Sequence, residues 1–154
     1  MGWEAERLLS QSFMVSADNA HGLHPNHPEY SDGTTAPTLN GGVVLKFNAN
    51  QRYATDGLSA SLFRKICEAA DVPVQTYYNR ADLPGGSTLG SISVSHVTVP
   101  TVDIGIAQLA MHSCYETAGV KDADYLARAM TAYYSSTPVF LSDGSCRIGG
   151  NPGK

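Results

Sequence analysis

The sequence predicts an α/β protein with a mixed central sheet flanked by helices. Segments with strand-like and helix-like patterns alternate along the 154 residues, and this alternation is typical of sheets covered by helices. Apolar residues make up 42% of the chain and charged residues 16%, which indicates a globular protein with a core. We therefore predict one domain at residues 1–141 and a flexible C-terminal tail at residues 142–154.

The first half of the chain contains two predicted strands separated by a long loop. Residues 4–10 have the pattern of the end of a helix, and residues 13–17 form a short apolar segment that predicts a buried strand. Pro, Gly, Asn and Thr are frequent in residues 22–41, which predicts a loop, and loops of this length in compact domains are usually functional. The apolar residues at 43–48 predict the second strand.

A helix is predicted from Thr55 to about Ala70. Leu58, Leu62 and Ile66 recur at every fourth position, which places them on one face of a helix. We expect Thr55 to cap the N-terminus, because its hydroxyl can accept a hydrogen bond from a free backbone N–H group.

The second half continues the alternation. Strands are predicted at residues 73–78 and 101–105, with a glycine-containing loop and a short helix between them. A last helix is predicted to start near Asp122 and to carry apolar residues on one face. These residues are Leu126, Met130 and Tyr133.

Charge and composition exclude several classes of partner. A net charge of −4 predicts neither nucleic acid nor an anionic membrane as a partner. No apolar run approaches the ~18 residues that cross a bilayer, and the N-terminal residues lack the apolar core of a signal peptide. The three cysteines have no C-x-x-C spacing, so we expect reduced thiols and a cytoplasmic location.

A cluster of possible metal ligands follows the first strand. Asp18, His21, His24 and His27 lie within twelve residues, and carboxylates and imidazoles are ligands that zinc accepts. The spacing matches no zinc-finger or His-Glu-x-x-His pattern, so a solvated or hydrogen-bonded loop is the alternative. We expect His24 to hold the loop and His27 to be solvated, and we assign no role to His96.

Sequence blocks in a fixed order indicate a family. Over about residues 5–135, they closely resemble the C-terminal part of the catalytic domain of the aspartyl aminopeptidase family. The blocks are SADNAHGLHPNH, GGVVLKFN, NQRYAT, NRADLPGGSTLG and VDIGIAQLAMHS. The resemblance implies a cocatalytic zinc metallo-aminopeptidase that removes N-terminal Asp or Glu from peptides. It also implies two zinc ions in the complete enzyme, with manganese or cobalt as possible substitutes.

The resemblance assigns roles to residues of this chain. It implies that Asp18 and His112 are metal ligands and that His21 contacts the substrate, where it can polarise the scissile carbonyl. It implies that Lys46 pairs with the acidic side chain of the substrate and that Tyr53 also contacts the ligand. Taken alone, these residues have simpler interpretations: an aspartate that forms a turn or caps a helix, a hydrogen-bonded core histidine, and an edge or outward-facing lysine.

The glycine-containing loop is assigned in the same way. The resemblance implies that Gly85 and Gly86 line the substrate cleft, with their backbone N–H groups near the bound amino acid. The loop lacks the pattern of a phosphate-binding loop. We expect Asp82 to support this loop, and Gln108 and Ser113 to orient the His112 imidazole.

The resemblance also implies missing parts. In the family a histidine, a bridging aspartate and an adjacent Glu-Glu pair come from upstream, and an inserted domain mediates homo-oligomers. This chain has no two adjacent acidic residues, so we assign no catalytic residue and expect a fragment whose activity requires the N-terminal part. The alternative is a catalytically inactive binding or assembly module that keeps the acidic amino-acid pocket. A truncated gene, a split enzyme and an independent protein all remain open.

Overall fold

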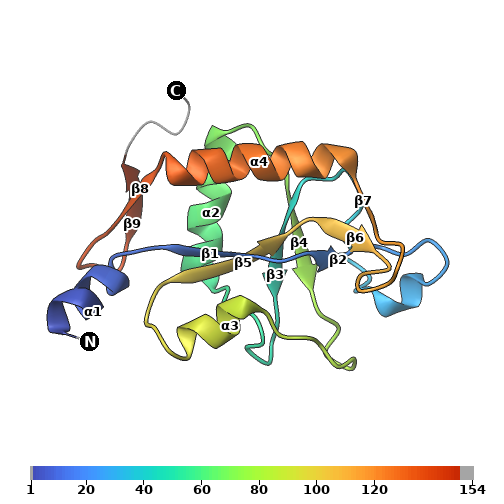
Figure 1. The fold of residues 1–154 in the computed structure, drawn as a ribbon, viewed down its shortest axis with the longest axis horizontal. Helices are drawn as coiled ribbons and strands as arrows, with labels where there is room; N and C mark the ends of the chain where they lie inside the picture. The colour runs from blue at the N-terminus through green and yellow to red at the C-terminus, as the bar shows by residue number, and fades with distance from the viewer. Residues whose placement is uncertain (1, 150–154) are drawn as a thin grey trace.

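The computed structural model describes residues 2–149, and its centre is a mixed four-stranded sheet in the order β1-β5-β3-β4. The strands are β1 (Met14–Ala17), β3 (Val43–Phe47), β4 (Val74–Tyr78) and β5 (Thr101–Gly105). β1 runs parallel to β5 and β3 runs parallel to β4, whereas β3 and β5 are antiparallel. The mixed α/β fold predicted from the sequence is confirmed, and β3 is an interior strand of the sheet (Figure 1).

Helices cover both faces of this sheet. α2 (Gly57–Ala69) and α4 (Val120–Tyr134) pack against each other and against β5 and β3. The short helix α3 (Leu89–Val94) packs against β1 and β5. Figure 1 shows α4 and α3 on opposite sides of the strands. α1 (Trp3–Ser10) confirms the predicted N-terminal helix and buries none of its residues.

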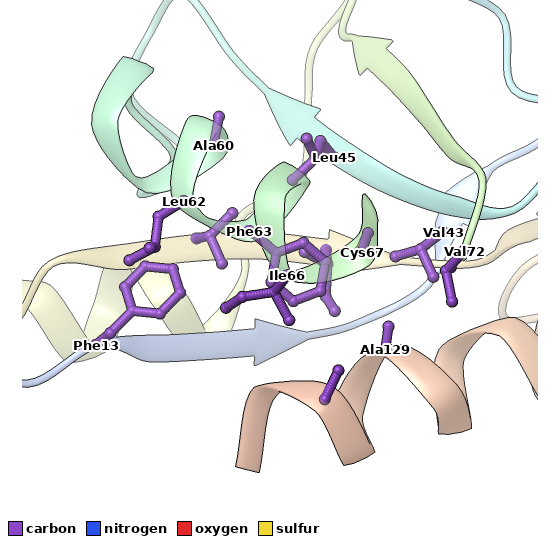
Figure 2. Packing of buried hydrophobic residues seen from close by; sticks show 13 residues of the cluster. Phe13, Val43, Leu45, Ala60, Leu62, Phe63, Ile66, Cys67, Val72 and Ala129 are labelled. Atoms are coloured by element: carbon purple, nitrogen blue, oxygen red, sulfur yellow. The ribbon is translucent and has the colours of Figure 1, made fainter. Parts of the chain in front are cut away.

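The hydrophobic core lies between the sheet and α2 with α4. Phe63 and Ile66 of α2 are fully buried against Leu45 of β3, and Ala129 of α4 closes the cluster (Figure 2). Because side chains alternate along a strand, the residues next to Leu45 face the other side of the sheet. Lys46 lies on that other side, which carries the candidate site.

The N-terminus of α2 differs by one residue from the prediction. Asp56, not Thr55, is the N-cap, and its Oδ1 accepts a 2.7 Å hydrogen bond from the Ser59 backbone N–H group. The Ser59 hydroxyl in turn accepts a 3.0 Å bond from the Asp56 N–H group, which completes a capping box. The Thr55 hydroxyl instead accepts a 2.8 Å hydrogen bond from the Asp103 backbone N–H group.

The last helix begins two residues before the predicted start at Asp122. Asp122 is fully buried in its first turn, and its carboxylate accepts 2.6 Å and 2.8 Å bonds from the N–H groups of Asn40 and Gly42. This carboxylate therefore ties the end of the long loop to α4.

Smaller elements complete the fold. β2 (Ala20–His21), β6 (Ala107–Leu109) and β7 (Thr117–Ala118) form a three-stranded sheet in the order β2-β6-β7. One turn of 3₁₀ helix, η1 (Pro28–Tyr30), lies in the long loop. No helix within residues 2–149 is long and apolar enough to cross a membrane.

The predicted flexible tail is wrong for part of its length. β8 (Thr137–Phe140) and β9 (Cys146–Gly149) form an antiparallel hairpin across the expected boundary at residue 141. Phe140, Cys146 and Ile148 pack against the core, so burial of these side chains favours an ordered hairpin. Residues 150–154 lie outside the described part of the chain.

Candidate metal and substrate site

The structure brings the two predicted metal ligands to one cavity. Asp18 follows the end of β1, and His112 follows β6 after a tight turn. Both line a cavity of about 90 Å³. The same cavity is lined by predicted substrate-binding residues that come from four other segments of the chain. These are His21, Lys46, Tyr53 and Gly86.

The donor set fits part of a zinc site. The Asp18 side chain is 52% exposed, and His112 is exposed, so a carboxylate and an imidazole are available at the cavity. Catalytic zinc takes three protein ligands and keeps a fourth position open. Within residues 2–149, no group of three or more His, Cys, Asp or Glu side chains could hold a metal ion. Asp18 and His112 therefore offer an incomplete set of ligands.

Lys46 is a buried cation at the wall of this cavity. Only 3% of the residue is exposed, and its Nζ donates a 3.0 Å hydrogen bond to the Asn19 carbonyl oxygen. Nζ also lies 3.6 Å from Asp18 Oδ2. Burial lowers the pKa of Lys46, whereas the carboxylates of Asp18 and Asp103 oppose this change. The alternative of an outward-facing lysine is wrong, because β3 is an interior strand and Lys46 faces the cavity.

Tyr53 lies against this lysine. The Lys46 Nζ is 4.8 Å from the centroid of the Tyr53 ring, which is within the range of a cation–π interaction. Burial raises the pKa of Tyr53 to about 12, so the phenol keeps its proton at neutral pH and remains a hydrogen-bond donor.

His21 has an environment that favours the neutral imidazole. It lies on the short strand β2, where its register partner is Gln108 of β6. Part of the His21 side chain is exposed. Burial of the rest lowers the pKa of His21, the positive charge of Lys46 and the neighbouring His112 lower it further, and Asp18 opposes this change. A neutral imidazole can donate one hydrogen bond and accept another.

The turn that carries His112 has unusual backbone angles. Ala110 has φ +53° and His112 has φ +69°, in the left-handed region that residues with a Cβ rarely adopt. The His112 N–H group donates a 2.6 Å bond to Glu116 Oε1, which holds the turn. Backbone strain of this kind is frequent at functional sites.

The expected supports of His112 are not the ones found. The Ser113 hydroxyl accepts a bond from the Tyr115 N–H group. Gln108 lies on β6, is 6% exposed and leaves its Oε1 without a partner among the described residues. The residue that supports the turn is Glu116, which sequence reasoning missed. Its spacing of four residues from His112 was the available signal.

The loop with Gly85 and Gly86 follows β4 and reaches the site. Asn79 Nδ2 donates to the carbonyl oxygens of Arg80 and Leu83, which fixes the start of the loop. The Asp82 carboxylate makes two bonds to the guanidinium of Arg80 at the start of the same loop, so the expected support from Asp82 stays a prediction. Gly86 lines the cavity with Asp18 and His112, and Gly85 lines an adjoining one.

The adjoining cavity is larger and lies under the long loop. Its volume is about 360 Å³, and it shares His21, Tyr53 and Gly86 with the smaller cavity. His24 also lines it, and His24 Nδ1 accepts a bond from the Asn26 N–H group within the loop. His27 is exposed, as predicted, and forms a 3.0 Å ion pair with Glu29 when protonated.

Sequence reasoning also missed Asp103. This residue lies in the middle of β5 and is fully buried. Its Oδ2 accepts a 2.6 Å bond from the Ala54 N–H group, and its Oδ1 has no partner among the described residues. The signal was an acidic residue inside an otherwise apolar strand.

Comparison with known proteins identifies the family. Residues 3–134 match the family described as aminopeptidase I zinc metalloprotease (M18). The chain belongs to this family. It is similar to the probable M18 family aminopeptidase 2 of Ectopseudomonas mendocina (strain ymp), with 50% identity over 130 residues. The match covers 84% of this chain and 30% of that protein, so the chain spans about a third of the length of this curated relative.

Solved structures agree with this assignment to the M18 family. The chain superposes on Ape4 in its cryo-EM complex with Nbr1 with a TM-score of 0.79 and 41% identity, over 80% of this chain and 24% of that chain. It superposes on the mApe1 dodecamer of Saccharomyces cerevisiae with a TM-score of 0.72 and 29% identity, over 80% of this chain and 27% of that one. The predicted peptidase family is confirmed at the level of M18, a family described as zinc metalloproteases.

Proposed function

We propose that this chain is the metal-binding and substrate-binding part of a zinc aminopeptidase that removes N-terminal Asp or Glu from peptides. The supporting observation is the position of Lys46 beside Asp18 in a cavity that also contains His112. A fixed, buried ammonium next to a candidate metal ligand suits a substrate with a carboxylate side chain at its N-terminal residue. An apolar side chain would leave this buried charge without a partner.

Each side chain has a role in this proposal. The Asp18 carboxylate and the His112 imidazole hold zinc together with ligands supplied by the rest of the enzyme. When bound, zinc polarises a carbonyl oxygen and activates water for hydrolysis. Manganese or cobalt could replace it, and the complete enzyme holds two ions.

The remaining residues orient the substrate. The Lys46 ammonium pairs with the acidic side chain, and the Tyr53 hydroxyl donates a second hydrogen bond to it. Neutral His21 donates a hydrogen bond to the carbonyl oxygen of the scissile bond. The backbone of Gly85 and Gly86 forms the opposite wall of the cleft.

In this proposal, a residue outside this chain supplies the general base for peptide hydrolysis. No residue here is assigned to that step, so peptide hydrolysis requires a partner that carries the missing part of the enzyme. A homo-oligomer is the proposed assembly of the complete enzyme, which the dodecameric structure of mApe1 supports. The three free cysteines support a cytoplasmic location.

The alternative is an inactive module that binds acidic amino acids or takes part in assembly. The burial of Lys46 is compatible with it, because recognition of an acidic ligand needs the same cation. The two functions differ in whether the chain supports hydrolysis once the missing parts are present.

A chimera tests the proposal. Residues 3–134 of this chain replace the matched segment of the Ectopseudomonas mendocina aminopeptidase. We expect zinc-dependent hydrolysis of Asp- and Glu-linked chromogenic substrates. Asp18→Ala and His112→Ala should each lower kcat/KM by more than the ~10- to 100-fold caused by loss of an indirect metal contact.

His96→Ala is the control for His112→Ala, since His96 is an exposed histidine with no assigned role. A folded chimera with bound zinc and no activity on any substrate would favour the inactive module. Equal hydrolysis of acidic and apolar substrates would contradict the proposed specificity.

A further inference from the structure

We propose that Asp103 is a positioning residue for the acidic-residue pocket, which fixes the segment Tyr53–Thr55 so that the Tyr53 ring stays against Lys46. This inference rests on the proposed function for the roles of Lys46 and Tyr53 in recognising substrate. Asp103 does not line the cavity of Asp18 and His112, and it acts through its neighbours.

Hydrogen bonds connect Asp103 to both residues that follow Tyr53. Asp103 Oδ2 accepts a 2.6 Å bond from the Ala54 N–H group. The Asp103 backbone N–H group donates a 2.8 Å bond to Thr55 Oγ1, which lies 3.4 Å from the Asp103 carbonyl oxygen. This segment has no helix or strand of its own before α2 begins, so these bonds set where Tyr53 lies.

The register of the sheet puts Asp103 close to Lys46. β3 and β5 pair Val44 with Gly105 and Leu45 with Ile104. The next residues along this antiparallel register are Lys46 and Asp103, on the face opposite the core. Their side chains therefore emerge from neighbouring strands on the same side of the sheet.

A purely structural role does not explain why the second carboxylate oxygen of Asp103 is buried without a partner in the described part of the chain. Oδ1 is buried and has no hydrogen-bond partner among the described residues, and such an oxygen is costly to bury. Asparagine or threonine would offer the Ala54 N–H group only a neutral acceptor, which makes a weaker hydrogen bond than a carboxylate. A negative charge near the buried ammonium of Lys46 accounts for an aspartate here.

Asp122 is a matched control within the same chain. Like Asp103 it is fully buried and accepts short hydrogen bonds from the backbone of a loop, here from Asn40 and Gly42. The two residues that Asp122 holds do not line the cavity of Asp18 and His112, whereas Tyr53, which precedes the Ala54 held by Asp103, does. Changes at Asp122 therefore report the general effect of altering a buried carboxylate.

The first test measures specificity in the chimera with Asp103→Asn and Asp122→Asn. We expect Asp103→Asn to raise KM for an Asp-linked substrate ~10-fold, the lower end of the effect of a charge-assisted hydrogen bond. The value of kcat/KM for a Leu-linked substrate should change less than ~3-fold, and Asp122→Asn should leave the ratio of the two substrates unchanged. Equal losses on both substrates with Asp103→Asn would overturn the proposal.

The second test needs no activity and uses the 154-residue chain itself. Nuclear magnetic resonance measures amide exchange of Ala54 and the contact between the Tyr53 ring and the Lys46 side chain. Asp103→Ala should accelerate Ala54 exchange at least ~10-fold, since a charge-assisted bond is lost, and should weaken the ring contact. Asp122→Ala should instead accelerate exchange at Gly42.

The two tests separate the two proposals. If the chimera is inactive on every substrate, the proposed function fails, and the resonance experiment alone decides the role of Asp103. An unchanged Tyr53–Lys46 contact in folded Asp103→Ala would overturn the positioning role even in an active enzyme.

Discussion

The Lys46 ammonium lies 4.8 Å from the centre of the Tyr53 ring, although the two residues belong to different elements. Lys46 lies on the interior strand β3, and Tyr53 lies in the segment that leads into α2. Desolvation of the ammonium is unfavourable, and the ring face, the Asn19 carbonyl oxygen and Asp18 partly compensate for it. A cation held in this way is kept ready for a negatively charged ligand.

The first prediction concerns the contribution of Lys46 to stability. Lys46→Met removes the buried ammonium and leaves the buried Asp103 carboxylate without its neighbouring cation, so we expect the free energy of unfolding at pH 7 to fall by about 3 kcal/mol. In the chimera the same change should lower kcat/KM for Asp- and Glu-linked substrates ~10- to 150-fold, with little effect on Leu-linked ones and on zinc content.

Urea denaturation of the isolated chain and kinetics of the chimera measure the two effects. Lys65→Met is the control, because Lys65 pairs with Glu68 on the exposed surface of α2. An unchanged or higher free energy of unfolding with Lys46→Met would mean that desolvation of the ammonium outweighs its contacts, including the one with Asp103.

The second prediction concerns the protonation of His21. Burial and the charges of Lys46 and His112 lower its pKa below the reference value of 6.5, so its titration followed by nuclear magnetic resonance should have a midpoint below 6.5. Lys46→Met should move this midpoint upward, because it removes a positive neighbour. An unchanged midpoint in Lys46→Met would mean that Lys46 does not contribute to the lowered pKa of His21.

The sign of the effect on stability follows from the same shift. Below pH 6.5 the unfolded chain binds more protons at His21 than the folded chain, since the folded pKa is the lower one. The contribution of His21 to stability is therefore complete above pH 6.5 and is lost as the pH falls toward and past the folded pKa. His21→Gln should reduce the loss of stability between pH 7 and pH 5.

Much of the site was predictable because its residues follow strands. Asp18 comes directly after an apolar segment, and strand ends in α/β proteins place side chains at the edge of the sheet. The position of Lys46 inside an apolar strand favoured an edge or outward-facing lysine when taken alone, and its role came from the family resemblance. The α2 helix was predicted from its apolar period, and its first residue was missed by one because Thr55 and Asp56 are both good caps.

The remaining features depend on contacts between distant residues. Asp103 and Ala54 are 49 residues apart in sequence, and nothing local indicates that one holds the other. The β8–β9 hairpin was missed because its composition resembles that of a flexible tail, while its order comes from packing of Phe140 and Ile148 on the core. Tertiary burial outweighed the local preference in that segment.

The third prediction is that the isolated chain has no appreciable peptidase activity. The proposed function assigns no general base to this chain, and Asp18 and His112 are an incomplete set of metal ligands among residues 2–149. Added zinc, manganese or cobalt should therefore not produce turnover of an Asp-linked chromogenic substrate. Isothermal titration should show weak zinc binding that Asp18→Ala and His112→Ala each reduce. Robust turnover abolished by Asp18→Ala would contradict the need for a missing part.

The last prediction concerns Gly90 of α3, which packs on the Asp103 carboxylate. A Cβ at Gly90 would lie 2.6 Å from both carboxylate oxygens of Asp103, and Asp103 cannot move freely because Ala54 and Thr55 hold it. Gly90→Ala should therefore lower the free energy of unfolding by about 1–3 kcal/mol, the usual cost of overpacking. This loss should exceed the gain of up to about 1 kcal/mol from better helix propensity.

Gly57→Ala is the matched control for this prediction. Gly57 also lies in a helix, and a Cβ there meets nothing within 4 Å, so alanine should raise the free energy of unfolding by about 0.5–1 kcal/mol. Urea denaturation of both variants, with amide exchange of Ala54 as a local probe, compares steric contact with propensity. If Gly90→Ala stabilised the chain as much as Gly57→Ala, the Asp103 carboxylate would have room to move, and the rigid support of Tyr53 would be contradicted.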